Sequence, residues 1–151
     1  MKISDYLSPE RVIFLKSTTK AEALEELIHA AKDFNENISV EQLREAVWKR
    51  EEMMSTGVGQ GIGIPHVRLP GLEKVAMAVG ISREGIADYE SLDNKPVHVI
   101  VLIIVPQGQH ELYIRLLAEV VGILKREDIR RAIIEAKDAS EAYKILTRMG
   151  T

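Results

Sequence analysis

The chain has 151 residues, of which 46% are hydrophobic, so it has the size of one domain and enough apolar residues for a substantial core. Its net charge of −3 gives no general attraction to nucleic acid or anionic membranes, and the lack of cysteine excludes disulfides and thiol catalysis. No apolar signal segment follows the N-terminus, and the longest apolar run, residues 99–105, is too short to cross a bilayer. We therefore expect one cytoplasmic domain over residues 1–151, with any membrane role carried by a partner.

Two helices are predicted in the first third of the chain. Thr19 and Glu22 have the spacing of a capping box, and apolar residues follow at helical spacing as far as Phe34. Ser39 and Gln42 repeat this signal and predict a second helix that reaches about residue 53. The next stretch, residues 55–66, is rich in glycine and shows neither helical periodicity nor clustered polar residues.

Strands and helices alternate in the rest of the chain. Residues 74–81 predict a strand, and the almost continuously apolar residues 97–105 are typical of a central strand covered on both faces. Apolar residues at helical spacing predict helices over residues 112–124, 128–136 and 140–149. Strands interleaved with helices indicate an α/β fold in which helices flank a β-sheet.

The glycine-rich stretch has glycine at every second position, namely Gly57, Gly59, Gly61 and Gly63. Glycine lets the backbone approach a ligand or another segment closely, and backbone N–H groups in such loops can point together at an anion. The spacing does not match a dinucleotide-binding loop, and the stretch lacks the lysine of a P-loop, so we expect no nucleotide cofactor. A tight glycine turn before a strand is the structural alternative.

His66 ends this stretch and is the candidate nucleophile. It follows Pro65, whose ring fixes its own backbone and restrains Ile64, so the imidazole is presented from a stiff backbone. A neutral imidazole nitrogen is a good nucleophile, and an unperturbed histidine is mostly neutral at pH 7. From the residues alone, the alternative is a histidine that only caps a turn.

These residues form a familiar pattern. Arg50 and Glu51 at the end of a predicted helix, followed by residues 55–59 and 62–66, resemble the signature of enzyme IIA domains of the bacterial phosphoenolpyruvate-dependent sugar phosphotransferase system (PTS). The resemblance is to the fructose/mannitol type 2, which includes the nitrogen-regulatory branch, and it covers nearly the whole chain. Further counterparts of the family pattern are the strand ending at residue 106, His110 and the helix from residue 112. The resemblance implies a single domain with a mixed β-sheet flanked by helices, and we expect neither a cofactor nor a metal ion.

The resemblance also implies an activity. His66 takes a phosphoryl group from the phosphohistidine of the histidine-containing phosphocarrier protein and donates it to an enzyme IIB component for sugar uptake. The protein would then be a phosphotransferase that reaches a membrane component only indirectly and has no nucleic-acid partner.

Two further residues are implied at the site. His110 matches the family's second active-site histidine and lies near the start of a predicted helix, where free N–H groups favour anions. Arg50 matches the family's arginine, and a guanidinium can hold phosphoryl oxygens with two hydrogen bonds. Without the resemblance, His110 is a surface loop histidine and Arg50 a solvated member of a mixed charge run.

Four residues are expected to support the site. Glu51 is either an orienter of the His66 ring or an anchor of the glycine loop. Thr56 either donates a hydrogen bond to the phosphoryl group or caps the loop. Gly57 and Gly59 belong to the loop itself.

The chain departs from the family pattern at two positions. Gly63 stands where the family usually has alanine, which is a mild change. Val67 stands where the family usually has a small residue. Because Val67 is β-branched and follows the nucleophile directly, we expect it to alter access to His66 or the geometry of the loop.

Two other functions remain as alternatives. The first is a regulatory domain of the nitrogen type, whose phosphorylation state controls binding to a partner or transporter. The second is a metal hydrolase that uses His66, His98 and His110, although the sequence has no H-x-x-x-H or H-E-x-x-H spacing. Two histidines, His29 and His98, lie far from the signature in sequence and are not assigned to the phosphoryl site.

Overall fold

The computed structural model describes residues 2–31 and 37–149. These residues form a six-stranded mixed sheet in the order β1-β5-β6-β3-β2, with β4 also paired to β6. The strands are β1 (Val12–Phe14), β2 (Gly57–Gly59), β3 (Ile62–Gly63), β4 (His66–Leu69), β5 (Ala76–Ile86) and β6 (Val97–Pro106). The helices are α1 (Lys20–Ala31), α2 (Val40–Met53), α3 (His110–Leu124), α4 (Glu127–Ile134) and α5 (Ala139–Met149), with short 3-10 helices η1 (Ile3–Asp5) and η2 (Pro9–Arg11).

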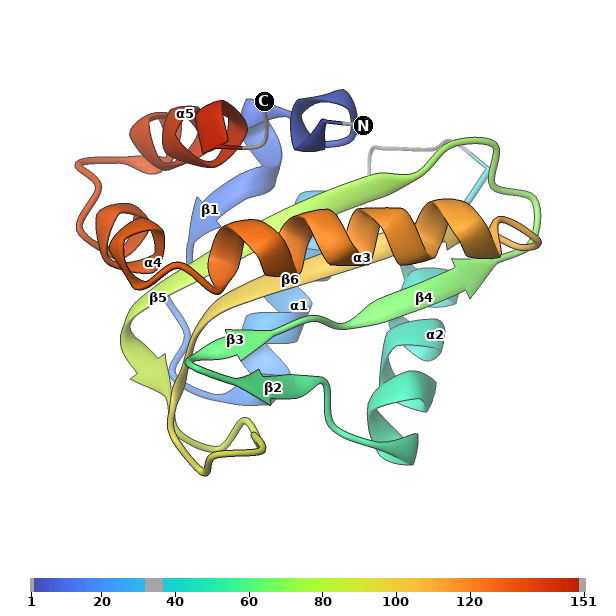
Figure 1. Cartoon of the computed structure of the whole chain (residues 1–151). Helices are drawn as coiled ribbons and strands as arrows, with labels where there is room; N and C mark the ends of the chain where they lie inside the picture. The colour runs from blue at the N-terminus through green and yellow to red at the C-terminus, as the bar shows by residue number, and fades with distance from the viewer. Residues whose placement is uncertain (1, 32–36, 150–151) are drawn as a thin grey trace.

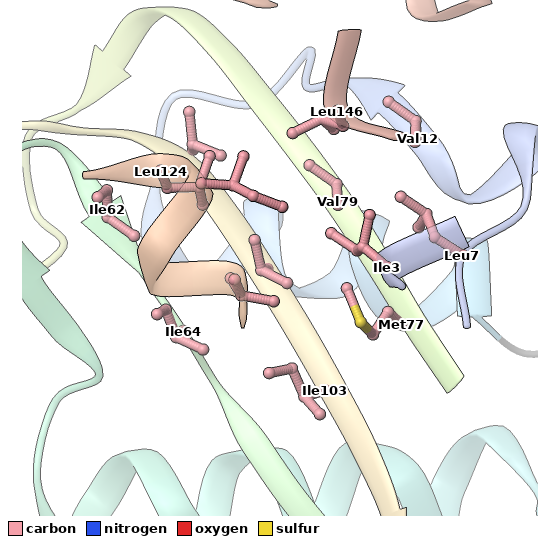
Figure 2. Close-up of a cluster of buried hydrophobic side chains, with 14 of the residues drawn as sticks. Ile3, Leu7, Val12, Ile62, Ile64, Met77, Val79, Ile103, Leu124 and Leu146 are labelled. Atoms are coloured by element: carbon pink, nitrogen blue, oxygen red, sulfur yellow. The ribbon is translucent and has the colours of Figure 1, made fainter. Parts of the chain in front are cut away.

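Helices cover both faces of the sheet, which confirms the predicted mixed sheet flanked by helices. Figure 1 shows α3 crossing one face, with α1 and α2 behind the other. Side chains of β6 alternate between two cores: Val101 and Ile103 pack on the α3 side, whereas Leu102 and Ile104 pack on the α1–α2 side. Figure 2 shows the α3-side core, where Ile103 lies near other buried apolar residues, among them Met77 and Val79 of β5 and Ile3 and Leu7 near the N-terminus. This double burial explains why residues 97–105 are almost continuously apolar, as predicted.

Both predicted capping signals are present in the structure. At the start of α2, the Gln42 backbone N–H donates to the Ser39 hydroxyl (3.0 Å), and the Ser39 N–H donates to the Gln42 side chain (2.9 Å). At the start of α1, the Glu22 N–H donates to the Thr19 hydroxyl (3.3 Å). Phe34, which ends the predicted stripe of the first helix, lies outside the described residues.

Several elements were not apparent from the sequence. The glycine-rich stretch forms β2, β3 and the start of β4, but glycine at every second position removes the alternation of apolar and polar side chains that marks a strand. Strand β1 has three residues, which is too short to show a pattern. Strand β5 runs on to Ile86 through an irregular register, and α3 begins at His110 instead of residue 112. In residues 2–31 and 37–149, no helix has both the length and the apolar character that a membrane span requires.

The pairing of β4 decides which way the site residues point. Strand β4 runs parallel to β6, with His66 opposite Ile103. Because side chains alternate along a strand, His66 and Arg68 project from one face of β4, and Val67 and Leu69 from the other. Val67 and Leu69 are buried in the α1–α2 core, so His66 and Arg68 lie on the α3 side.

Candidate functional site

His66 is the first residue of β4 and is half-buried on the α3 side of the sheet. Its Nδ1 lies 3.1 Å from the backbone carbonyl oxygen of Ile64. Since a carbonyl oxygen can only accept, Nδ1 must carry the proton, and the lone pair of the neutral ring is then on Nε2. The ring also packs against Tyr113 of α3, with a centroid distance of 4.9 Å.

The surroundings of His66 favour its neutral form. Burial lowers the pKa of the imidazole below its ordinary value, and the positive charges of Arg50 and Arg68 lower it further. The hydrogen bond to Ile64 and the charge of Glu51 act in the opposite direction but do not outweigh these effects. His66 is therefore neutral at pH 7, which is the nucleophilic state.

A groove of about 550 Å³ opens beside His66, between the β2–β3 hairpin and α3. Arg50, Thr56, Gly57 and Gly59 line it together with His66. Its rim carries large exposed apolar side chains, namely Met54, Val58, Leu92 and Val121. Exposed apolar side chains gathered around a groove are typical of a surface that binds another protein.

Arg50 lies in the last turn of α2 and lines the groove. Its Nη1 donates to the backbone carbonyl of Met54, just beyond the end of the helix, at 2.8 Å. Within residues 2–31 and 37–149, no other hydrogen-bond or ion-pair partner of this guanidinium is found. The remaining N–H groups of Arg50 are thus available to an anion in the groove.

His110 is the first residue of α3, is exposed, and does not line the groove. Nη2 of Arg68 lies 2.9 Å from its Nδ1. A guanidinium only donates, so Nδ1 of His110 accepts and the ring proton is on Nε2, where it can be donated. Tyr113 joins the two histidines, because its ring centroid lies 6.4 Å from that of His110 as well as 4.9 Å from that of His66.

Three backbone N–H groups of the glycine-rich stretch are bonded to side chains of the protein. The N–H of Thr56 donates to Glu51 (3.3 Å), that of Gly59 to Ser91 (3.0 Å) and that of Gln60 to Asp93 (2.9 Å). These three donors are taken by protein acceptors and are therefore not available to an anion in the groove.

Gly57 and Gly59 shape the hairpin. A Cβ atom on Gly57 would lie 2.2 Å from the backbone oxygen of Glu90, so only glycine permits this close approach. Gly59 has a φ of +98°, a conformation that other residues rarely adopt.

The structure separates the two roles considered for Glu51 and for Thr56. Glu51 is buried and accepts from the Thr56 N–H, whereas the His66 ring is bonded to Ile64, which favours Glu51 as a loop anchor. The Thr56 hydroxyl lies 2.6 Å from the hydroxyl of buried Tyr89, which favours Thr56 as a loop cap.

Both departures from the family pattern have a place in the structure. A Cβ atom on Gly63 would lie 2.9 Å from Cζ of Tyr89, so the ring of Tyr89 occupies the space that a side chain would need. Val67 is 5% exposed and belongs to the α1–α2 core, on the opposite face of the sheet from His66. Contrary to our expectation, it does not crowd the imidazole.

Sequence reasoning missed Arg68 and Tyr113. Arg68 lies two residues after His66, so a predicted strand at this point would have placed both side chains on one face. Tyr113 lies three residues after His110 and therefore on the same side of α3.

The three histidines of the metal-hydrolase alternative do not form a site. Nδ1 of His98 is bonded to the Ser82 carbonyl at 2.8 Å, near the irregular end of β5. In the part of the chain that the structure describes, no three histidine or acidic side chains are grouped as a metal ion would require.

Comparison with known proteins identifies the family. Residues 5–149 match the family model described as "Phosphoenolpyruvate-dependent sugar phosphotransferase system, EIIA 2". A nitrogen regulatory protein of Bradyrhizobium diazoefficiens is 32% identical over 97% of this chain and 95% of its own length. The PTS system fructose-specific EIIABC component of Bacillus subtilis is 30% identical over 98% of this chain, which spans 23% of that relative's length.

The same family is found among solved structures. Nitrogen Regulatory Protein IIA-Ntr from Neisseria meningitidis superposes with a TM-score of 0.87 at 27% identity, over 96% of this chain and 99% of that one. The family model, the sequence relatives and this structure agree with the resemblance inferred from the sequence. The chain belongs to the EIIA type 2 family of the phosphoenolpyruvate-dependent sugar phosphotransferase system, a family of phosphotransfer proteins.

Proposed function

We propose that this chain is a phosphocarrier in which Nε2 of His66 accepts a phosphoryl group from the phosphohistidine of the histidine-containing phosphocarrier protein. The observation that carries the proposal is the hydrogen bond from Nδ1 to the Ile64 carbonyl, because it leaves the Nε2 lone pair free. The lowered pKa of His66 supports it, since the ring stays neutral at pH 7.

The transfer needs no cofactor. The Nε2 lone pair of His66 forms a bond to phosphorus while the donor's P–N bond breaks and its electron pair returns to the donor ring. The His66 ring gains positive charge, which the hydrogen bond from Nδ1–H to Ile64 stabilises. Negative charge is spread over the phosphoryl oxygens, so the free N–H groups of Arg50 are suited to stabilise it. His110 can add a hydrogen bond from Nε2–H.

We propose an enzyme IIB component as the acceptor. The name of the Bacillus subtilis relative combines A, B and C components in one protein, and this chain matches only part of it. The exposed apolar rim of the groove supports docking of another protein beside His66. In transfer to IIB, a bond forms between the acceptor atom and phosphorus while the P–N bond at His66 breaks and its electron pair returns to the His66 ring, so the phosphohistidine is an intermediate.

A regulatory role is the second candidate. It is supported by a relative named a nitrogen regulatory protein, which this chain matches over 95% of that relative's length. Onward transfer separates the two roles. Loss of the phosphoryl group to a IIB component supports the carrier, whereas a stable phosphoprotein with altered binding to a partner supports the regulator.

Labelling with radioactive phospho-carrier protein tests the proposal. We expect one acid-labile, alkali-stable phosphoryl group per chain and its complete loss in His66→Ala. The matched control is His29→Ala, because His29 is exposed on α1 and distant in the sequence from the signature. Full labelling of a folded His66→Ala variant would overturn the assignment.

A further inference from the structure

A buried polar cluster lies around Thr56, which directly precedes β2 and also lines the groove. Among the residues that the structure describes, Lys20, Glu51 and Thr56 are three of the four buried polar or charged residues outside the apolar core. Tyr89, which is 1% exposed, joins them through its hydroxyl. Burial of a polar group without a hydrogen-bond partner costs free energy, so these side chains depend on one another for partners.

Lys20 supplies the positive charge of the cluster. It is the first residue of α1, and its Nζ lies 3.0 Å from Oε1 of Glu51 and 2.9 Å from Oε1 of Glu90. Nζ also lies 4.7 Å from the centroid of the Tyr89 ring. Burial alone lowers the pKa of Lys20, but its contacts with Glu90 and Glu51 outweigh this and raise the pKa, so Lys20 is charged.

Glu51 depends on Lys20 for compensation of its charge. Its side chain is 1% exposed, and the only groups that reach its Oε1 in the described residues are Nζ of Lys20 and the N–H of Thr56. No hydrogen-bond donor among the described residues reaches Oε2. Without Lys20, no cation would contact the buried carboxylate of Glu51. A buried charge without a partner costs free energy of folding.

A continuous series of hydrogen bonds connects this carboxylate to the imidazole of His66. The Thr56 N–H donates to Glu51 at 3.3 Å. The carbonyl of Thr56 accepts from the Ile64 N–H at 3.0 Å, and the carbonyl of Ile64 accepts from Nδ1 of His66 at 3.1 Å. The position of Thr56 therefore affects the backbone group that sets the tautomer and orientation of the His66 ring.

We propose that Lys20 is a positioning residue for phosphoryl transfer at His66, acting through Glu51, Thr56 and Ile64. This inference rests on the proposed function of His66. Lys20 holds the Glu51 carboxylate in place, and Glu51 holds the Thr56 end of the hairpin. The Ile64 carbonyl then stays where it can accept from Nδ1, so Nε2 keeps its lone pair and the ring keeps its place in the lining of the groove.

The charge pair can be removed without removing the acceptor for Thr56. Lys20→Met deletes the cation with little change in side-chain length and leaves Glu51 uncompensated. Glu51→Gln keeps a side-chain oxygen that can accept from the Thr56 N–H but carries no charge. The double variant Lys20→Met/Glu51→Gln therefore lacks both charges and keeps the link to His66.

The experiment measures single-turnover labelling by the phospho-carrier protein, over a range of carrier concentrations, for these three variants and for the exposed control Lys74→Met. We expect Lys20→Met to reduce the saturating rate constant about 10-fold to 100-fold, the size of effect that a displaced reacting group causes, with little change in the concentration dependence. The double variant should recover most of the rate, and Lys74→Met should match the wild type. Wild-type rates in Lys20→Met, or a folded double variant that is as slow as Lys20→Met, would overturn the proposal.

A second readout does not depend on phosphoryl transfer. Long-range ¹H–¹⁵N NMR spectra of the unphosphorylated protein show which ring nitrogen of His66 carries the proton. We expect protonated Nδ1 in the wild type and the double variant, and a mixture of tautomers in Lys20→Met. If Lys20→Met does not fold, the test rests on the double variant. The proposal requires the double variant to fold, to carry the proton of the His66 ring on Nδ1, and to be labelled. If the wild type is not labelled at all, the proposed function fails, while the NMR comparison still tests the link from Lys20 to His66.

Discussion

The two sides of the β2–β3 hairpin differ in how their polar groups are used. On the groove side, Arg50 lines the groove and has one backbone partner, and His110, outside the lining, is exposed at the start of α3, so both retain N–H groups for an anion. On the buried side, Lys20, Thr56 and Tyr89 donate to or accept from one another or from acidic neighbours. The groove side can thus bind an anion, and the buried side holds in place the backbone next to His66.

This contrast predicts two classes of variant. A change on the groove side should slow phosphoryl transfer with little loss of stability, because exposed side chains contribute little to folding. A change on the buried side should lower stability, because close-packed and hydrogen-bonded groups cannot relax without cost.

Among changes that leave His66 in place, removal of the Arg50 charge should have the largest effect on transfer. We expect Arg50→Met to slow labelling about 100-fold, because loss of one group that stabilises transition-state charge commonly costs this much. The measurement is the single-turnover rate constant, with thermal unfolding as the test of stability. The neighbouring exposed Lys49→Met is the control and should keep the wild-type rate. Equal rates for the two variants would show that Arg50 does not contact the phosphoryl group.

A side chain at Gly63 should destabilise the fold. Gly63→Ala would bring a Cβ atom within 2.9 Å of the Tyr89 ring, and we expect a loss of about 1–3 kcal/mol in the free energy of unfolding, as for other overpacked sites. Urea denaturation measures this loss. Gly122→Ala is the matched control, because Gly122 lies in α3 and no other group lies within 4 Å of the added Cβ.

A second background sharpens this test. In Tyr89→Leu, which lacks the ring, Gly63→Ala should cost less than in the wild type, because the two sites are in contact and their effects are not additive. If Gly63→Ala lowers the free energy of unfolding equally in both backgrounds, the Tyr89 ring is not the group that resists a side chain at Gly63.

The smallest effect should be the change with pH in the reactivity of the His66 ring. The neutral ring reacts, so reactivity is lost as pH falls through the pKa of His66, which lies below the ordinary value of 6.5. Arg50→Met removes a positive charge that disfavours the imidazolium, so the pKa should rise and the loss should begin at higher pH. NMR titration of the His66 ring protons measures both values. A wild-type midpoint at or above 6.5, or a fall in Arg50→Met, would contradict this picture of the groove.

The groove side was easier to predict from the sequence than the buried side. Arg50, His66 and His110 were assigned to the site because they fall at the spacing of a known signature. The helices and β6 were predicted because their apolar residues are periodic or continuous. Local signals of this kind need only neighbouring residues. They were also enough to predict a sheet flanked by helices, although the strand order was not predicted.

The buried side depends on contacts between distant segments. Lys20 reaches Glu51 from α1, and Tyr89 reaches Thr56 from the loop after β5, so no local spacing indicates either pair. Strands β2 and β3 were missed for a different reason, because their glycines carry no side chain to show periodicity. Nor does the sequence indicate that Glu51, Ser91 and Asp93 accept from N–H groups of the glycine-rich stretch.

The central claim is that Nε2 of His66 is the atom that takes the phosphoryl group. The direct test is ¹⁵N and ³¹P NMR of the protein after reaction with the phospho-carrier protein. We predict a single phosphohistidine at His66, with phosphorus on Nε2 and a proton retained on Nδ1, where it donates to the Ile64 carbonyl. Phosphorus on Nδ1, or on any residue other than His66, would contradict the account.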